Sequence, residues 1–257
     1  MKNIICIVAR TNSTRLPQKV LKKIGDRMLI EHLIDRMKLS VEFDEIYICT
    51  SSHKDDSILI DIAKENEVKY VAGSELAVIE RLLDAAEKSG AKNLVRVTGD
   101  NPLTDPFILD DVLKDHIKKD ADYSLMTFLP RGSTGDVIRV EALKKLYGMM
   151  DPNESQYLGI YINNPKEFEC NFIFPPKEMF NPYINISVDM PNEFEDVTEL
   201  INNLGIEKET SEYVKYAQSQ KICSFPKEKL IKVSETKSMK YGDYIEWQVK
   251  KVKGEAV

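Results

Sequence analysis

The sequence NIICIVARTNSTRLPQK, residues 3–19, joins a short apolar segment directly to a polar and cationic one. Residues 3–9 are uncharged and rich in β-branched side chains, a pattern typical of a buried strand. The polar loop that follows runs from Arg10 to about Gly25. Open α/β folds bind their ligands in loops of this kind, which follow the carboxyl ends of strands. This segment therefore favours an α/β fold with a ligand-binding loop near its amino terminus.

Strands and helices alternate through the residues that follow. Short apolar segments predict strands over residues 45–50, 69–72, 93–98 and 122–128. Apolar side chains at helical spacing predict helices over residues 28–39, 56–66, 76–89 and 106–119. Such alternation predicts a Rossmann-like α/β fold, in which a mainly parallel sheet carries helices on both faces. The loops at residues 10–25, 50–56 and 99–106 then follow strands, and ligand-binding residues are expected there.

The rhythm changes after Pro130. Strands are expected over residues 135–140, 169–174 and 183–188, and helices over 141–147, 151–162, 190–203 and 208–219. We therefore expect one α/β domain over residues 1–205, with an insert at about 130–185. Residues 206–257 are expected to form a helical carboxy-terminal extension, for which the sequence predicts no role.

The composition is that of a globular protein rather than a disordered or membrane one. The chain has 257 residues, of which 42% are hydrophobic and 30% charged. The apolar run at residues 4–9 is far shorter than the roughly 20 residues of a membrane-spanning helix, and no signal peptide is visible. The four cysteines and three histidines are scattered, which argues against a zinc site or a disulfide scaffold. We expect a cytoplasmic protein with reduced thiols that does not act at a membrane.

Charge is distributed unevenly along the chain. The formal net charge is −6, yet residues 1–30 hold seven Lys and Arg against a single acid. Residues 31–204 are strongly acidic, with eighteen basic and thirty-three acidic side chains. This balance argues against nucleic acid as a partner and favours a local anion site near residues 10–27.

The loop after the first strand has the composition of a polyphosphate site. Arg10, Arg15 and Lys19 are interleaved with the small hydrogen-bonding residues 11–14. Arginine offers forked hydrogen bonds to phosphate and lysine a mobile point charge. The loop matches neither the Walker pattern nor the Gly-rich turn of dinucleotide-binding folds. A solvated basic loop is the alternative interpretation.

Two aspartates each follow an apolar segment. Asp100 lies in VTGDNPL, residues 97–103, and Asp189 lies in ISVDMPNE, residues 186–193. Mg²⁺ in nucleotide sites is held by one or two carboxylates together with phosphate oxygens and water. A turn or a helix cap is the alternative for each residue. Together with the cationic loop, the pair predicts a site for a Mg²⁺-bound triphosphate.

Several segments in series resemble the cytidylyltransferase family of the CMP-sugar synthetases, and most closely its spore-coat polysaccharide branch. The matching segments are ARTNSTRLPQKVL (9–21), YICTS (47–51), VIERLLDAA (78–86), VRVTGDNPL (95–103) and VDMPNEFE (188–195). The resemblance implies a mixed sheet of the nucleotide-diphospho-sugar transferase type, CTP as substrate, Mg²⁺ as cofactor and a homodimer. It also implies that the insert at 130–185 serves acceptor recognition and subunit contact.

The resemblance implies roles for individual residues. Those expected at the nucleotide are Ala9, Arg10, Thr11, Ser13, Arg15, Lys19, Thr50, Ser51, Arg81 and Asp100. Among them Arg15, Lys19 and Asp100 would be catalytic, and Asp100 and Asp189 would bind the metal. Some alternatives stay open. Arg81 could form a salt bridge on a helix face, Ser51 could cap the next helix, and Arg96 could be a structural ion-pair partner.

The chain departs from the family where the second substrate should bind. Asn101 stands where the branch usually has Cys, residues 130–137 form a longer link, and residues 154–158 replace a His-containing segment. We assign acceptor binding to Arg131, Arg139 and Gln156.

The hypothesis from sequence is a Mg²⁺-dependent transfer of CMP from CTP with release of pyrophosphate. No general base is evident, so an acceptor whose nucleophile is already ionised, an acidic sugar or a phosphorylated small molecule, is preferred. The alternatives are a glycosyltransferase that uses a finished sugar nucleotide and a non-catalytic nucleotide-binding protein of the same fold.

Overall fold

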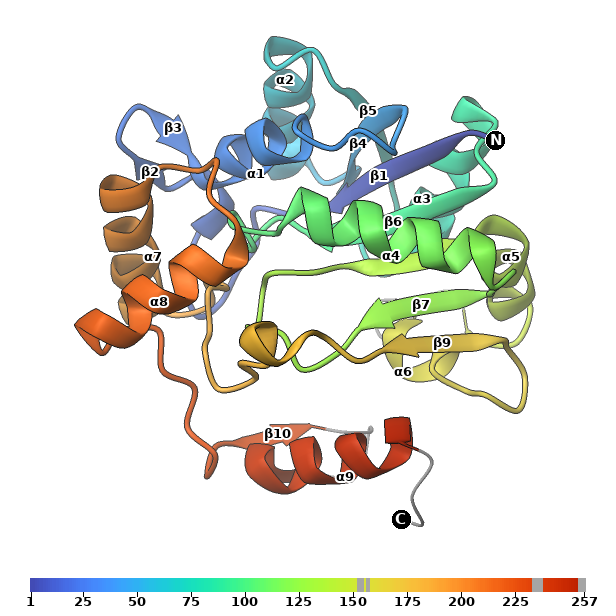
Figure 1. The fold of residues 1–257 in the computed structure, drawn as a ribbon. Helices are drawn as coiled ribbons and strands as arrows, with labels where there is room; N and C mark the ends of the chain where they lie inside the picture. The colour runs from blue at the N-terminus through green and yellow to red at the C-terminus, as the bar shows by residue number, and fades with distance from the viewer. Residues whose placement is uncertain (152–154, 156–157, 233–237, 254–257) are drawn as a thin grey trace.

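The computed structural model describes residues 1–151, 155, 158–232 and 238–253. A seven-stranded sheet forms its centre, in the order β5-β4-β1-β6-β8-β7-β9 (Figure 1). The strands in that order are Lys69–Gly73, Glu45–Ser51, Asn3–Val8, Asn93–Thr98, Asp136–Arg139, Tyr123–Met126 and Cys170–Ile173. The sequence order differs from the spatial order because the helices between strands carry the chain across the sheet.

Most neighbouring strands run in parallel. β1 pairs in parallel with both β4 and β6, and β4 pairs in parallel with β5. β8 is antiparallel to its neighbours β6 and β7, whereas β9 is again parallel to β7. The prediction of a mainly parallel, mixed sheet is confirmed. Because β1, β4, β5 and β6 point the same way, the loops after them meet at one edge of the sheet.

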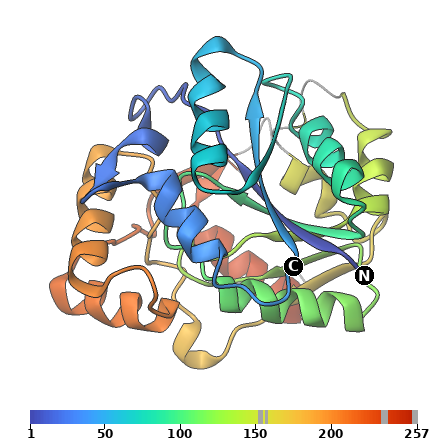
Figure 2. The same cartoon turned by 90° about the horizontal axis from the view of Figure 1, so that it is seen from above.

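Helices cover both faces, as the alternation in β1 requires. Ile4 and Cys6 point to the face covered by α3 (Val78–Ser89), α5 (Val140–Tyr147) and α6 (Leu158–Ile162). Ile5 and Ile7 point to the face covered by α1 (Leu29–Met37), α2 (Ser57–Glu65) and α4 (Pro106–Lys118). Figure 2 shows α3 and α4 on opposite sides of the strands. Successive side chains of a strand alternate between faces, so each face is buried against its own helix layer.

Two further units complete the described chain. Helices α7 (Pro191–Leu204) and α8 (Thr210–Gln220) pack beside the small hairpin of β2 (Lys23–Ile24) and β3 (Arg27–Met28). Arg36 of α1 anchors α8, because its buried guanidinium donates to the Lys208 carbonyl at 3.0 Å and to the Tyr213 hydroxyl at 3.1 Å. β10 (Leu230–Lys232) and β11 (Ser238–Lys240) pair antiparallel, and β11 leads into α9 (Tyr241–Lys253). Short 3₁₀ turns lie at Lys19–Leu21, Lys54–Asp56 and Lys177–Met179.

Some sequence-based expectations need correction. The strand expected over residues 183–188 is wrong, because these residues form only isolated bridges, Arg131 with Asn185 and Ile184 with Ser224. Two different segments share its backbone groups, so no continuous ladder develops. β7 ends at Met126, since Phe128 has a left-handed φ of 60° that extended strands do not use.

The helix expected over residues 151–162 is found over Leu158–Ile162, while Asp151 is not helical. Residues 152–154 and 156–157 lie outside the described part of the chain. Within the extension expected to be helical, no individual helix was predicted over residues 241–253, because the sequence there is rich in lysine and weakly patterned. In the described ranges no helix is long and apolar enough to cross a membrane.

Candidate functional site

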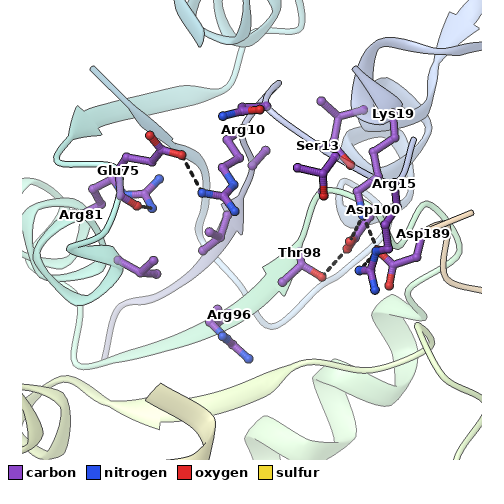
Figure 3. A pocket seen from close by; sticks show the side chains of 17 residues that line it. Arg10, Ser13, Arg15, Lys19, Glu75, Arg81, Arg96, Thr98, Asp100 and Asp189 are labelled. Carbon is purple, nitrogen blue, oxygen red and sulfur yellow. Dashed lines mark hydrogen bonds and ion pairs between the residues drawn. The ribbon is translucent and has the colours of Figure 1, made fainter. Parts of the chain in front are cut away.

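A cleft of about 360 Å³ opens at the edge of the sheet where β1 and β6 end (Figure 3). Its walls come from the loop after β1, the loop after β6, the start of α3 and the segment that precedes α7. The lining residues are Val8, Ala9, Arg10, Asn12, Ser13, Thr14, Arg15, Lys19, Val20, Glu75, Val78, Arg81, Arg96, Thr98, Gly99, Asp100 and Asp189. The cleft therefore unites the cationic loop with both aspartates that sequence analysis singled out.

Close contact between two loops fixes the floor of the cleft. The Gly99 N–H donates to the Val8 carbonyl at 2.9 Å, which holds the loop after β6 against the end of β1. A Cβ atom on Gly99 would lie 2.8 Å from the Cβ of Ala9, closer than real Cβ atoms approach. Glycine at 99 and a small residue at 9 therefore let the two loops meet, and this contact carries Asp100 toward the cationic loop.

Lys19 lies between the two aspartates. Its Nζ is 2.5 Å from Oδ2 of Asp100 and 2.6 Å from Oδ1 of Asp189, and Arg15 approaches the same Asp189 oxygen at 2.9 Å. The Lys19 side chain is only 12% exposed. The Val188 N–H donates to the Asp100 carbonyl at 2.9 Å, so the backbone also joins the two acidic segments. The two carboxylates thus converge on one cation, from segments far apart in sequence.

The charges in this cluster stabilise one another. Burial alone would raise the pKa of the Asp189 carboxyl. Lys19, and then the positive charges of Arg15 and Arg131, outweigh burial and hold that pKa below its ordinary value. Burial alone would lower the pKa of the Lys19 ammonium, but Asp100 and Asp189 raise it above its ordinary value. Lys19 and Asp189 are therefore both charged at neutral pH.

Further arginines line the opposite side of the cleft, as Figure 3 shows. Arg10 pairs with Glu75 at 2.6 Å, and both side chains are about half-exposed or less. Arg81 is buried and donates to the carbonyls of Cys49 at 2.9 Å and Glu75 at 3.3 Å. Burial lowers the pKa of Arg81 from its ordinary value. Arg96 pairs with Asp136 at 2.6 Å, which is the structural ion pair considered for it. Arg96 also lines the cleft.

Three residues expected at the nucleotide lie outside the cleft. The Thr11 N–H and hydroxyl both donate to the Asp56 carboxylate at 2.7 Å, and the Ser51 hydroxyl donates to its other oxygen. Thr50 is fully buried. None of the three is among the residues that line the cleft. The alternative considered for Ser51, a cap on the next helix, is not observed either, because the N-cap residue of α2 is Asp56 and Ser51 donates only to its carboxylate.

The residues assigned to the acceptor separate in space. Arg131 lines a second hollow of about 280 Å³, which it shares with Thr98, Asp100 and Asp189. Arg139 lies elsewhere, because it pairs with Asn93 at the start of β6 and forms an ion pair with Asp120 at 2.6 Å. The structure therefore brings Arg131, but not Arg139, to the hollow that adjoins the cleft. Gln156 lies outside the described residues.

The two carboxylates suit a divalent cation that arrives with phosphate. In the part of the chain that is described, no cluster of three or more His, Cys, Asp or Glu could hold a metal. Asp100 and Asp189 instead offer two carboxylates, which already attract the Lys19 ammonium. Mg²⁺ characteristically takes one or two carboxylates and completes its shell with phosphate and water. The donor set therefore fits Mg²⁺ bound together with a nucleotide.

Sequence reasoning missed two residues of the site. Thr98 donates its hydroxyl to Asp100 at 2.7 Å and accepts from the Asn101 amide at 2.9 Å, which orients the carboxylate. Its place as the last residue of a strand before Gly-Asp was the available signal. Glu75, the partner of Arg10, gave none, because it lies in a loop 65 positions away.

The chain resembles one protein family and several known proteins, three of which are described here. The sequence model of a family described as cytidylyltransferase matches residues 4–242. An uncharacterised protein of Methanocaldococcus jannaschii is 32% identical over 202 residues, which are 78% of this chain and 83% of that protein. The spore coat polysaccharide biosynthesis protein SpsF of Bacillus subtilis is 28% identical over 213 residues, 80% of this chain and 89% of its own. The solved structure of a cytidylyltransferase from Leptospira borgpetersenii matches with a TM-score of 0.79 at 27% identity, covering 86% of this chain and 95% of that one.

Proposed function

This chain belongs to the cytidylyltransferase family, and on that premise we propose that it transfers CMP from CTP to an acidic sugar or a phosphorylated small molecule with the help of Mg²⁺. As a member it is a nucleotidyltransferase that uses CTP, and its similarity to SpsF connects it with sugar biosynthesis. In the reaction, an oxygen of the acceptor forms a bond to the α-phosphorus of CTP. The bond from that phosphorus to the bridging oxygen breaks, and pyrophosphate leaves with the electron pair.

One observation carries the proposal: the cationic loop and both aspartates line a single cleft, with Lys19 between Asp100 and Asp189. A triphosphate needs cations beside its leaving group, and we assign Lys19 and Arg15 of the loop to that position. Arg10, on the other side of the cleft, would orient the nucleotide. In phosphoryl transfer, positioning and electrostatic stabilisation supply most of the rate enhancement.

Asp100 and Asp189 would hold Mg²⁺ when the nucleotide binds. The metal would neutralise phosphate charge and polarise the phosphoryl oxygens. Thr98 keeps the Asp100 carboxylate oriented through its hydroxyl at 2.7 Å. Lys19, displaced from between the carboxylates, would then be free to pair with phosphate oxygens, since its charge is retained at neutral pH.

The acceptor would approach from the hollow that contains Arg131. That hollow shares Asp100 and Asp189 with the nucleotide cleft, so it opens directly onto the proposed reaction centre. Both carboxylates that line the hollow interact with Lys19, so neither is assigned as a general base. An acceptor oxygen that is already ionised requires no such base. A negatively charged acceptor is also matched by the guanidinium of Arg131, which suits a carboxylate or phosphate.

The test is a pyrophosphate-release assay with each of the four common nucleoside triphosphates and Mg²⁺. The acceptor panel contains 3-deoxy-manno-octulosonate, N-acetylneuraminate, glucose 1-phosphate and glycerol 3-phosphate. We expect release with CTP that depends on both the acceptor and the metal. Equal release with all four nucleotides would contradict the cytidine assignment.

Two other outcomes identify the rival functions. CTP binding by calorimetry without turnover of any acceptor would indicate a non-catalytic nucleotide-binding protein. Consumption of a finished CMP-sugar without pyrophosphate chemistry would indicate a glycosyltransferase. The proposal also includes a homodimer, as the family resemblance implies, and light scattering of the purified protein measures it.

A further inference from the structure

A third cavity is lined in part by Arg131 and shares no lining residue with the nucleotide cleft. Its volume is about 280 Å³, and α9 forms one of its walls. The opposite wall comes from β7, β9 and the segment that follows β7. In Figure 1, α9 lies beyond β9, at the edge of the sheet opposite β5. The lining side chains from α9 are Tyr241, Tyr244, Ile245 and Gln248.

Arg131 connects this cavity to the reaction centre. Arg131 and Gly132 line both the cavity under α9 and the hollow that contains Asp100 and Asp189. The Arg131 N–H donates to the Ile184 carbonyl at 2.9 Å, and its own carbonyl accepts from the backbone at 2.8 Å. Gly132 has φ 90°, and a Cβ there would lie 2.8 Å from the Ser187 nitrogen. The backbone that carries Arg131 is therefore fixed at the junction of the two spaces.

The charge of Arg131 is not matched by an ion pair. Arg10, Arg15 and Arg96 each form one with a carboxylate, but Arg131 forms none with any described residue. Its guanidinium instead lies over the Phe225 ring, 4.4 Å from the centroid, and 5.8 Å from that of Tyr241. Its Nε is buried without a hydrogen-bond partner in the described structure, and so is the Thr134 hydroxyl in the same lining. Arg131 acts on Asp189 and Tyr241 through its charge, but with no described carboxylate in direct contact it can still accept an anionic group of a ligand, and the aromatic rings orient it for this.

The rest of the lining suits the body of a sugar. It is mostly apolar and aromatic, with Phe128 and Tyr244 among its members, which fits the C–H faces of a sugar ring or an acyl group. Gln248 donates to the Tyr244 hydroxyl at 2.8 Å, so that hydroxyl keeps its own proton available for a ligand oxygen. The volume lies just below the usual range for small-molecule pockets, so it fits a group about the size of a monosaccharide. A small phosphate bound at Arg131 would leave this space empty.

We propose that the cavity between α9 and the segment after β7 holds the body of the acceptor, with Arg131 at its mouth binding the acceptor's negative charge, and that α9 sets acceptor specificity. The acceptor class is then an acidic sugar with a partly apolar body. The inference rests on the proposed function, because it places the second substrate of that reaction. It assigns a role to the carboxy-terminal extension, for which the sequence predicted none.

The experiment measures the KM of the panel acceptor that gives the highest turnover, and the KM of CTP, in Tyr244→Ala and Gln248→Ala. We expect the acceptor KM to rise about tenfold in Tyr244→Ala, which corresponds to about 1.4 kcal/mol of lost binding. The KM of CTP should stay within about twofold, since α9 does not line the nucleotide cleft. Glu246→Ala, on the exposed side of the same helix, is the matched control and should leave both constants unchanged.

The outcomes separate this inference from the proposed function. Absence of CTP-dependent pyrophosphate release in the wild-type protein would overturn the proposed function, and the inference with it. Wild-type turnover with an unchanged acceptor KM in both α9 variants would overturn the inference alone. Preference for glycerol 3-phosphate over both acidic sugars would also overturn it and leave the cytidylyltransferase function intact. Tyr244→Phe, which keeps the ring, provides a measurement if the alanine variant folds poorly.

Discussion

Replacing Lys19 with methionine tests the cluster at the centre of the site. Lys19→Met keeps most of the side-chain length but removes the charge that Asp100 and Asp189 share at 2.5 and 2.6 Å. Two ionised carboxylates then face each other without a cation between them. We expect the variant to be less stable than the wild type at neutral pH, and to bind Mg²⁺ at the exposed carboxylates in the absence of nucleotide.

The magnitude follows from partial burial. The Lys19 side chain is 12% exposed, and those of the aspartates are 23% and 28% exposed. Removing one partner of a fully buried pair costs about 3–5 kcal/mol, whereas exposed pairs contribute about 0–1 kcal/mol. We therefore expect a loss of about 2 kcal/mol, or about 4–8 °C in Tm for a chain of this size. Mg²⁺ at ten times its Kd should restore about 1.4 kcal/mol.

The pH dependence has a definite sign. The pKa of Asp189 lies below its ordinary value. Its contribution to the free energy of unfolding is therefore complete above about pH 4 and is lost as the pH falls through the folded-state pKa. The pKa of Lys19 is raised, so its contribution is complete below about pH 10 and is lost as the pH rises through its folded-state value. The stability difference between Lys19→Met and the wild type should therefore be greatest between these limits and should shrink in acid.

The assay is urea unfolding at pH 7 and pH 3, with and without MgCl₂. Lys23→Met is the control, because Lys23 is exposed on the neighbouring hairpin. An equal loss of stability at both pH values would refute the electrostatic interpretation of the cluster. Failure of Mg²⁺ to stabilise Lys19→Met would refute the view that the two carboxylates form a cation site.

Three further predictions concern other residues. Asp100→Asn should lower kcat by about 10²–10³-fold, as expected when an electrostatic stabiliser is lost, while the circular dichroism spectrum stays unchanged; undiminished kcat would exclude the metal role. Arg131→Ala should raise the acceptor KM about tenfold or more. Arg139→Ala should leave it unchanged, because Arg139 pairs with Asp120 away from the cleft. Equal effects of the two substitutions in steady-state kinetics would contradict the placement of Arg131. Burial lowers the pKa of His116 to about 4, so the free energy of unfolding should fall by about 3 kcal/mol as the pH drops from about 6.5 to 4. His116→Gln should flatten that slope in urea titrations, and an unchanged slope would show that other groups cause it.

The strands, the helices and the cationic loop could be predicted because their signals are local. Residues 3–9 alternate apolar side chains between two buried faces, and Arg10, Arg15 and Lys19 follow within one loop. Asp100 could be predicted for the same reason, since Gly99 and the end of a strand precede it. Residues that follow parallel strands can be predicted to lie near one another, because the sheet places the carboxyl ends of those strands together.

The features that sequence could not supply depend on distant contacts. Arg131 and Arg139 looked equivalent, but β8 runs antiparallel to β6, which carries Arg139 to the opposite end of the sheet from Thr98. Thr11 looked like a ligand for phosphate, yet Asp56 accepts its hydrogen bonds from 45 positions away. The sequence of helix α9 has only a weak apolar pattern. Its position depends on remote segments, since Tyr241 and Ile245 are buried in one cluster with Phe128 and Phe225.

Analysis of the reaction products tests the central claim most directly. The protein is incubated with CTP, Mg²⁺ and the acidic sugars of the panel, and the products are identified by mass spectrometry alongside a pyrophosphate assay. The proposed function predicts a CMP-sugar and one pyrophosphate for each molecule formed. Formation of CDP and free phosphate, or CMP that is not attached to the acceptor, would contradict it.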